Sequence, residues 1–319
     1  MKNQVLRFLI QPGDAGQRVD QVLPRYDASL SRTRLRKLID IGAVHLAGRR
    51  LSQCSRQVEA GQTIEIFIDG LPLVSWSLSE TAIIYQDRFL LVLNKPAGID
   101  SQPTPSRFKG TVYSALQKYL EPSQGVGQVT LGMVQRLDRG TSGVMVFSIH
   151  PSAHKGLTEA LSQRQADKRY LALVAGELPD DQGEFRSLLA RNRARNLVKS
   201  VERGGKEAIT RFRVLTRRCG TTLVEIELLT GRTHQIRAHF SEQGYPLLGD
   251  VRYGGPESLA GYRFRHPLLH SWQLGLNHPV SRHELRFIAP LPGDWALFWK
   301  QLGRDLPDLE HLIEAAQAK

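Results

Sequence analysis

The chain has 319 residues, 41% of them hydrophobic and 23% charged, an ordinary composition for a globular protein of about two domains. Lysine and arginine number 43 against 31 aspartates and glutamates, and the net charge of +12 favours a polyanionic partner, nucleic acid first. The two cysteines, Cys54 and Cys219, are far apart, which excludes a disulfide framework and a cysteine-built zinc site.

Membrane and secretory classes also lose support. No apolar run approaches the roughly 18 residues that cross a bilayer. The start of the chain breaks its short apolar stretch with Arg7 and lacks the core of a signal peptide. Together with the few cysteines, this predicts a cytoplasmic protein without a membrane partner.

Residues 1–75 are predicted to form a small α/β module. A helix is expected over residues 31–41, because Ser31 is a favourable N-cap and Gly42 suits the C-terminal stop. The module's other predicted elements are a short amphipathic helix or turn over 18–24 and strands over 43–46 and 63–68. The solvent side of the longer helix carries the basic residues predicted to bind RNA: Arg32, Arg34, Arg36 and Lys37.

After a linker at 70–81, residues 82–303 form the second predicted domain, and apolar residues at helical spacing predict a C-terminal helix over 304–319. The second domain is strand-rich, with strands expected over 89–93, 143–147, 170–174 and 223–229 and helices near 111–121, 152–165 and 232–243. Regular alternation of strands and helices is missing. The predicted fold class is therefore α+β, with a mixed, mainly antiparallel sheet.

The positive charge is concentrated between residues 186 and 213, where nine basic residues stand against two acidic ones. Arg191, Arg193 and Arg195 are typical of a loop or strand that follows phosphates, because arginine binds them bidentately and releases counterions. A solvated basic loop is the alternative. With the basic helix of the first module, the clustering favours nucleic acid.

A first chemically suggestive segment surrounds Asp138. This carboxylate lies between Arg136 and Arg139, which favours its anionic form and suits a nucleophile or an electrostatic anchor better than a general acid. Gly140 and Gly143 allow a sharp loop that brings the backbone close to a ligand. The alternative is an ordinary loop aspartate in a salt bridge.

A second segment, residues 230–240, follows a strand and opens a helix in which Thr233 is the expected cap. Arg237 lies one turn later, placed to reach an anion near the helix start. His234 and His239 are five residues apart, the wrong spacing for a metal pair, and are expected to pack or to form hydrogen bonds. A third candidate, Tyr170, begins a strand and by itself indicates only packing.

Several common motifs are missing. The chain has no phosphate-binding GxxxxGK[ST] loop, no GxGxxG after a first strand, no HExxH and no GxSxG. Nucleotide-driven, nicotinamide-dependent, zinc-peptidase and serine-hydrolase functions therefore lose their usual support, and no cofactor or metal is expected.

Taken in order, the segments resemble the RluA family of RNA pseudouridine synthases. Residues 136–143 resemble the family's signature, with Gln135 and Gly140 standing where the family often has His and Asp. Further family-like motifs follow in the family's order at 94–98, 168–170, 206–210, 231–237, 249–254, 269–270 and 289–292. Residues 15–68 resemble the small RNA-binding module named after a small-subunit ribosomal protein.

The resemblance implies an isomerisation in which the glycosidic bond of uridine breaks and the uracil rejoins the sugar through carbon five, without cofactor or metal. Asp138 is then the essential carboxylate, which attacks the ribose or the base or assists elimination at the sugar, and Arg237 is its basic partner. Tyr170 is the residue that would stack on the target base and could assist removal of the proton from carbon five. Arg136 or Arg139 would fill the space left by a flipped-out uridine. Thr141 completes the implied substrate-binding set.

The resemblance also favours large-subunit ribosomal RNA over transfer RNA as the substrate, and a monomer is the default expectation. Two other classes compete. In a non-catalytic RNA-binding or ribosome-assembly factor, Asp138 would be only structural. A metal-dependent nuclease would need several clustered carboxylates, and Asp138 has none within its own motif.

Overall fold

The computed structural model describes residues 4–125, 128–163, 165–192 and 197–303. The predicted helix at 304–319 and the predicted RNA contacts Arg193 and Arg195 lie outside these ranges. The chain divides into two compact units, Met1–Leu78 with Ile99–Val129, and Ser79–Gly98 with Thr130–Lys319. Residues 99–129, which fall inside the predicted domain 82–303, therefore pack with the first unit. Within the described ranges, no helix is both long enough and apolar enough to cross a membrane.

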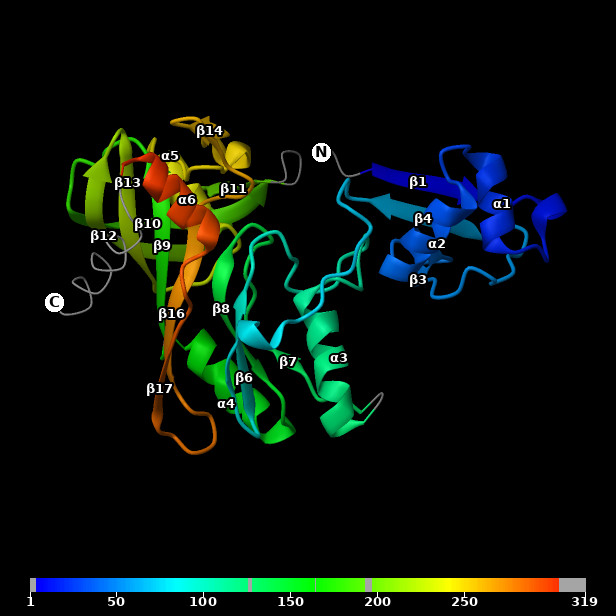
Figure 1. Ribbon diagram of the computed structural model, residues 1–319, viewed down its shortest axis with the longest axis horizontal. Helices are drawn as coiled ribbons and strands as arrows, with labels where there is room; N and C mark the ends of the chain where they lie inside the picture. Colours follow the sequence, from blue (N-terminus) through cyan, green and yellow to red (C-terminus); the bar gives the residue numbers. More distant parts are fainter. Residues whose placement is uncertain (1–3, 126–127, 164, 193–196, 304–319) are drawn as a thin grey trace. The chain divides into compact units, whose positions relative to one another are not determined.

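The first unit contains a four-stranded sheet in the order β1-β4-β2-β3, with antiparallel pairing throughout (Figure 1). Its elements are β1 (Gln4–Leu9), η1 (Pro12–Asp14), α1 (Val19–Tyr26), α2 (Arg32–Ile41), β2 (Val44–Leu46), β3 (Arg49–Arg50), β4 (Thr63–Ile68) and α3 (Val112–Gln124). The predicted ends of α2 are confirmed: the Arg34 amide donates to Ser31 Oγ at 3.3 Å, and Gly42 adopts a left-handed φ of +90°. Leu35 and Leu38 of α2 enter a core shared with Ile64 and Ile66 of β4.

Residues 99–129 are tied to the first unit by a buried ion pair. Arg107 holds Asp69 with two hydrogen bonds, from Nε at 2.5 Å and from Nη2 at 3.0 Å. Less than a tenth of either side chain is exposed, so this bidentate geometry must offset the cost of removing both charges from water. The Phe108 amide also donates to the carbonyl of Ile41 at 2.8 Å.

The second unit is built on a mixed sheet in the order β11-β10-β12-β13-β9-β16-β8-β6-β5, with β17 paired to β16 and β7 to β8. Among the described strands only β8 and β16 pair in parallel, which confirms the predicted α+β, mainly antiparallel class. The strands are β5 (Ile83–Gln86), β6 (Leu90–Lys95), β7 (Gly132–Met133), β8 (Ser142–Ser148), β9 (Asp167–Ala175), β10 (Gln182–Asn192), β11 (Leu197–Ser200), β12 (Lys206–Arg218), β13 (Thr221–Leu228), β14 (Ser258–Leu259), β15 (Tyr262–Arg263), β16 (Leu269–Asn277) and β17 (Glu284–Ile288). The helices are η2 (Glu80–Ala82), α4 (Pro151–Ser162), α5 (Gln235–Glu242), η3 (Val251–Tyr253) and α6 (Gly293–Gln301).

Helices α5 and α6 cover opposite faces of this sheet (Figure 1). Phe240 of α5 packs on Phe212 of β12, with ring centroids 5.7 Å apart. Trp295 of α6 instead joins the core cluster that contains Leu171 of β9. Leu171 and Arg213 lie on the same face of the sheet, because both are in register with the same residue of β13. Phe212 is next to Arg213 in β12, and successive residues of a strand point to opposite faces, so Phe212 and Leu171 lie on opposite faces. The α5 face is the one that carries the candidate site.

Candidate active site

The loop that carries Asp138 enters β8 and is fixed by backbone contacts. The Thr141 amide donates to the Asp138 carbonyl at 3.0 Å, and the Gly98 amide donates to the Arg139 carbonyl at 2.7 Å. Gly143 has a φ of +112°, and a Cβ there would lie 2.1 Å from the Ser271 carbonyl oxygen of β16. Only glycine allows β8 to approach β16 this closely, so the expected role of Gly143 in shaping this loop has a steric basis.

Lys95, at the end of β6, supports the same loop. Its side chain is fully buried, and its Nζ donates to the carbonyls of Pro96 at 2.9 Å and Arg139 at 3.3 Å. A buried ammonium must be matched by such acceptors. Lys95 belongs to the family-like motif at 94–98, and its contact with the Asp138 loop could not be read from that motif.

Arg237 of α5 bridges two carboxylates. Its Nη1 lies 3.1 Å from Asp138 Oδ2, while Nε and Nη2 grip Asp250 at 2.6 and 2.7 Å. Asp250 is only 1% exposed, and the Tyr253 ring lies 4.8 Å from the guanidinium carbon. Burial works to lower the pKa of Arg237, but the hydrogen bonds and charge of Asp250, with those of Asp138, raise it above its ordinary value. The guanidinium is therefore charged and fixed in its plane.

The two oxygens of Asp138 have different surroundings. Oδ2 contacts Arg237 at 3.1 Å and lies 3.6 Å from His234 Nε2. Within the described part of the chain, no side chain or backbone group holds Oδ1, and 26% of the side chain is exposed. Asp138 thus presents one anchored oxygen and one open oxygen, the arrangement that a nucleophile or a base needs.

Tyr170 of β9 is 8% exposed and lies near enough to Asp138 to feel its charge. Burial raises the pKa of Tyr170 to about 12, with a hydrogen bond to Ser271 opposing the shift and the Asp138 charge adding to it. The phenol is therefore neutral at physiological pH. This favours the expected stacking role over action as an anionic base.

The other predicted substrate-binding residues differ in exposure: Arg136 is exposed, Arg139 is half-buried, and Thr141 is buried. The structure also shows what surrounds Gly140 and Gln135, the two departures from the family pattern. A Cβ at Gly140 would lie 2.8 Å from Pro267 Cδ, so the proline ring occupies the space that a side chain would need. The Nε2 of Gln135 is buried and has no hydrogen-bond partner among the described residues.

The helix cap predicted at Thr233 is wrong. Helix α5 begins at Gln235, and its N-cap residue is His234, in the left-handed conformation with no side-chain cap. The Gln235 amide explains the shift, because it replaces a conventional cap: Oε1 accepts from Thr230 Oγ1 and the Arg232 amide, at 2.8 and 3.0 Å. The expectation that His234 and His239 form hydrogen bonds is confirmed.

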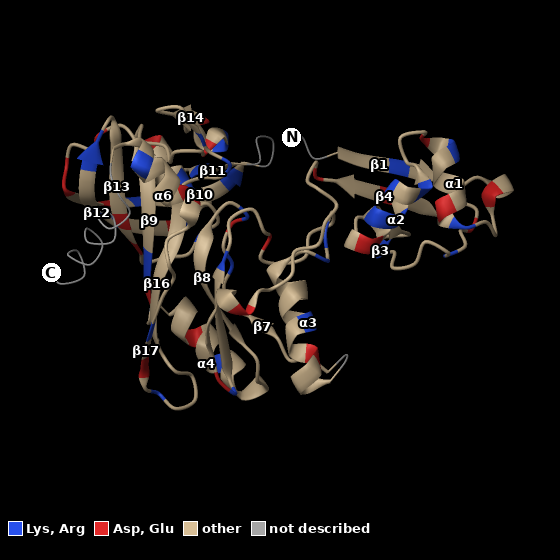
Figure 2. Cartoon of the chain, in the orientation of Figure 1, with Lys and Arg blue, Asp and Glu red and all other residues tan. Residues whose placement is uncertain are grey.

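Helix α2 carries the predicted basic residues (blue in Figure 2), and the buried carboxylate of Asp20 partly organises them. Arg18, Arg32 and Arg36 approach Asp20 to 2.9, 3.1 and 3.7 Å, each with two fifths or more of its side chain exposed. Burial works to raise the pKa of Asp20, but the hydrogen bonds and charges of Arg18 and Arg32 outweigh it and hold the pKa below its usual value. Lys37 is exposed and Arg34 half-buried, so the predicted cluster is accessible.

The basic stretch 186–213 is less positive than its sequence suggests. Arg191 is exposed at the end of β10. Three other arginines pair with acidic residues on a neighbouring strand: Arg186 with Glu207 at 3.1 Å, Arg211 with Glu184 at 2.8 Å, and Arg213 with Glu225 at 2.6 Å. Arg186 also pairs with Glu184 of its own strand at 3.2 Å. Strand pairing, which brings in Glu184 and Glu225 from outside the stretch, is the cause.

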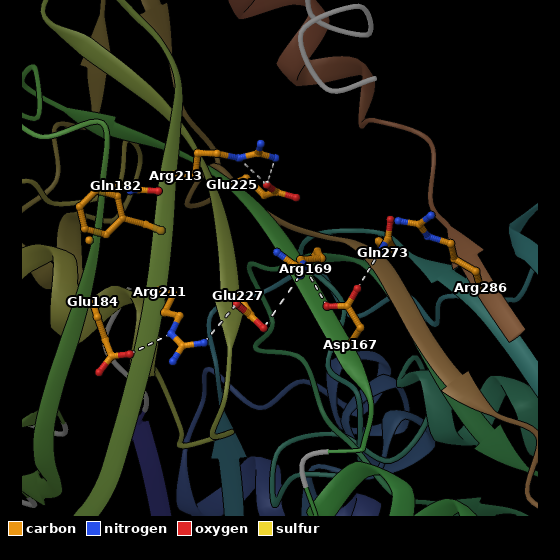
Figure 3. Close-up of a pocket in the computed structure, with 12 residues that line it drawn as sticks. Asp167, Arg169, Gln182, Glu184, Arg211, Arg213, Glu225, Glu227, Gln273 and Arg286 are labelled. Carbon is orange, nitrogen blue, oxygen red and sulfur yellow. Dashed lines mark hydrogen bonds and ion pairs between the residues drawn. The ribbon is translucent and has the colours of Figure 1, made fainter. Parts of the chain in front are cut away.

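The pairs of Arg211 with Glu184 and of Arg213 with Glu225 line a groove of about 720 Å³ on the other face of the sheet (Figure 3). Arg169 lines this groove and directly precedes Tyr170, so their side chains leave β9 on opposite faces. The groove's charged residues balance four against four: Arg169, Arg211, Arg213 and Arg286 with Asp167, Glu184, Glu225 and Glu227. A balanced set in which most charges are paired is typical of a solvated sheet face, and the groove does not contain the Asp138 cluster.

Comparisons with known proteins identify the relatives of this architecture. Residues 89–242 match the family model described as RNA pseudouridylate synthase, a range that contains Asp138, Tyr170 and Arg237. The uncharacterized RNA pseudouridine synthase YlyB of Bacillus subtilis is 32% identical over 284 residues, covering 88% of this chain and 92% of that protein. Ribosomal large subunit pseudouridine synthase D of Zymomonas mobilis is 34% identical over 303 residues, covering 90% and 94%. The solved structure of human RNA Pseudouridylate Synthase Domain Containing 4 matches with a TM-score of 0.58 at 25% identity, over 70% of this chain and 93% of that one.

Proposed function

We propose that this chain, which belongs to the RluA family of RNA pseudouridine synthases, isomerises uridine in large-subunit ribosomal RNA with Asp138 as its catalytic carboxylate. Isomerisation of uridine in RNA is the reaction of the family. The observation that carries the assignment of Asp138 is its asymmetric environment. Oδ2 is anchored by Arg237, whereas Oδ1 is open, and the charge of Asp138 acts on the buried Tyr170.

The reaction exchanges one bond to the ribose for another. The C1′–N1 bond breaks, the uracil turns, a C1′–C5 bond forms, C5 loses its proton and N1 gains one. Asp138 Oδ1 is the group placed to attack the nucleoside or to assist elimination at the sugar. Arg237 orients the carboxylate, because its other nitrogens are committed to Asp250 and fix the guanidinium plane. The neutral Tyr170 phenol offers a stacking surface for the base.

A uridine in folded RNA must leave its helix before it reaches Asp138. Arg136 is exposed and Arg139 is half-buried, and both flank Asp138 on the same loop. Either side chain is therefore a candidate to fill the space that the uridine leaves. Thr141 is buried, and its amide holds the Asp138 carbonyl at 3.0 Å. We therefore assign Thr141 to the shape of the loop as well as to substrate binding.

We further propose that residues 1–75 form an RNA-binding module and that residues 82–303 form the catalytic domain. The support for the module is the exposed arginine cluster around Asp20, which suits phosphates because the guanidinium groups remain accessible. In the second unit, the exposed Arg191 is proposed to bind phosphates as well. Such contacts supply affinity without reading bases.

The ribosomal substrate rests on relatives such as the Zymomonas mobilis protein, whose name gives the ribosomal large subunit as its target. A cytoplasmic location, where this RNA is made into ribosomes, is part of the same proposal. Pseudouridine mapping after deletion of the gene tests it. Loss at one or a few large-subunit positions, restored by the unaltered gene, is expected. Loss confined to transfer RNA would contradict the proposed substrate.

A further inference from the structure

His234 occupies a strained position beside Asp138. Its φ of +53° and ψ of +21° are left-handed, a region that only a few per cent of residues with a Cβ adopt. It directly precedes α5, and its carbonyl accepts the Ala238 amide at 2.9 Å. The main chain thus turns at His234 and begins the helix at the next residue.

The next residue supplies the constraint. Gln235 is 2% exposed, and both ends of its amide are engaged: Oε1 by Thr230 and Arg232, and Nε2 by the Ile209 carbonyl and Thr210 Oγ1 at 3.0 and 2.9 Å. A side chain held at so many points fixes the backbone on its N-terminal side. The strain at His234 therefore directs its ring to one place, the space between Tyr253 and Asp138.

The two ring nitrogens face different partners. Nδ1 lies 2.9 Å from the Tyr253 hydroxyl, and Nε2 lies 3.6 Å from Asp138 Oδ2. The Tyr253 oxygen already accepts the Val198 amide at 2.9 Å, so its own proton is available to donate to Nδ1. An unprotonated Nε2 would direct its lone pair at a carboxylate. The arrangement therefore favours the tautomer with the proton on Nε2.

The charge state agrees with this geometry. Burial lowers the pKa of His234 to about 4, with Asp138 opposing that shift and Arg237 and Arg252 reinforcing it. Burial also raises the pKa of Tyr253, which keeps the phenolic proton in place. At neutral pH the ring is thus an uncharged donor rather than a second cation beside Arg237.

We propose that His234 is a positioning residue for Asp138, a neutral imidazole that Tyr253 holds with its Nε2 proton directed at Oδ2. Arg237 and His234 would then approach the same oxygen from different elements and leave Oδ1 for the uridine. The 3.6 Å separation is expected to shorten when RNA fills the site, as such contacts do in substrate complexes. This inference rests on the proposed role of Asp138.

A tautomer measurement tests the inference without relying on activity. In the full chain labelled with ¹⁵N-histidine, we expect His234 at pH 7 to show an unprotonated Nδ1 and a protonated Nε2. Tyr253→Phe keeps the ring over Arg237 but removes the hydroxyl, and should mix the two tautomers. A proton found mainly on Nδ1 in the unaltered protein would overturn the proposal.

Kinetics separate positioning from packing. His234→Gln places an amide donor near the former Nε2, whereas His234→Asn is too short to reach Asp138 but tolerates the left-handed backbone better. We expect His234→Asn to lower kcat by roughly 10²-fold with RNA affinity unchanged, and His234→Gln to recover most of that loss. If backbone strain alone mattered, His234→Asn would turn over faster than His234→Gln. That order, or equal rates for the two variants, would overturn the proposal.

Two controls keep the outcome readable. If His234→Asn does not fold, Tyr253→Phe serves instead: a lower kcat at unchanged RNA affinity supports the inference, and an unchanged kcat contradicts it. If the unaltered protein itself forms no pseudouridine in RNA, the proposed function fails. The tautomer result then still decides whether the Tyr253–His234 contact is arranged as inferred.

Discussion

Arg237 contacts Asp138 through a single nitrogen, Nη1, at 3.1 Å. Its other two nitrogens are committed to Asp250. The contact with Asp138 is therefore aimed from a fixed guanidinium plane and leaves half of the carboxylate uncovered. A lysine could not do this, because its single ammonium cannot hold Asp250 bidentately and reach Asp138 as well.

Replacing Arg237 should affect chemistry and stability together. Arg237→Met removes the partner of Asp138, and we expect turnover to fall by roughly 10²-fold or more, since a misplaced reactive group loses its alignment. It also leaves Asp250 buried without a counter-charge, which costs about 3 kcal/mol or more. Single-turnover kinetics and urea unfolding measure the two effects. Arg263→Met, which removes a 77% exposed arginine paired to the exposed Glu257, is the matched control and should change neither appreciably.

Gly143 should be irreplaceable for steric reasons. In Gly143→Ala the new Cβ would meet the Ser271 carbonyl, and neither strand can move without disturbing the parallel β8–β16 pairing. We expect a loss of roughly 3 kcal/mol or more in unfolding free energy, seen in thermal or urea denaturation. Gly204 also has a positive φ, +75°, but open space around its Cβ position. Gly204→Ala should therefore cost only about 1 kcal/mol, and an equal effect of both variants would contradict the argument.

The buried His270 predicts a pH dependence of stability. It is fully buried against Ser142, and burial lowers its pKa to about 4 from an ordinary 6.5. Because the unfolded chain binds the proton more readily, this contribution is fully present above about pH 6.5 and is lost as the pH falls towards 4. The loss is on the order of 3 kcal/mol. Between pH 7 and 4, the urea midpoint of His270→Asn should fall less steeply with decreasing pH than that of the unaltered protein. The same pH dependence in both proteins would contradict the prediction.

The arginines around Asp20 should bind phosphates without reading sequence. In the double variant Arg32→Gln/Arg36→Gln, RNA affinity should fall by a similar factor for unrelated RNA sequences. The slope of log affinity against log salt concentration should become shallower by about one for each phosphate that is no longer bound. Filter binding at several salt concentrations measures this. Lys155→Gln, on an 89% exposed side chain of α4, controls for the loss of charge alone. Weaker binding of one RNA sequence only would instead indicate base recognition.

Local signals in the sequence predicted much of the fold. The N-cap Ser31, the apolar face of α2 and the stop at Gly42 act over a single helix, so their pattern was sufficient. The alternating strand at 63–68 was likewise found at its predicted bounds. Helix α6 was missed although Trp295, Phe298 and Trp299 lie at helical spacing, a signal that could have found it.

The site depends on contacts that no local pattern encodes. Asp138 and Arg237 are 99 residues apart, and only the resemblance to a family paired them in advance. Asp250 and Tyr253 become their partners because η3 packs beside α5, which spacing alone cannot indicate. The start of α5 was misplaced for a similar reason. The amide of Gln235 reaches back to Thr230 and across to Ile209, and this tertiary contact overrides the capping preference of Thr233.

The most direct test of the account is tritium release from RNA carrying uridine labelled at carbon five, measured with Asp138→Asn. The amide keeps the shape of the side chain, so RNA binding should persist or strengthen slightly as one negative charge is removed. It cannot act as a nucleophile or base, so release should fall to background. Asp181→Asn, at an 86% exposed aspartate, should release tritium like the unaltered protein. Appreciable release by Asp138→Asn would contradict the assignment of the catalytic carboxylate.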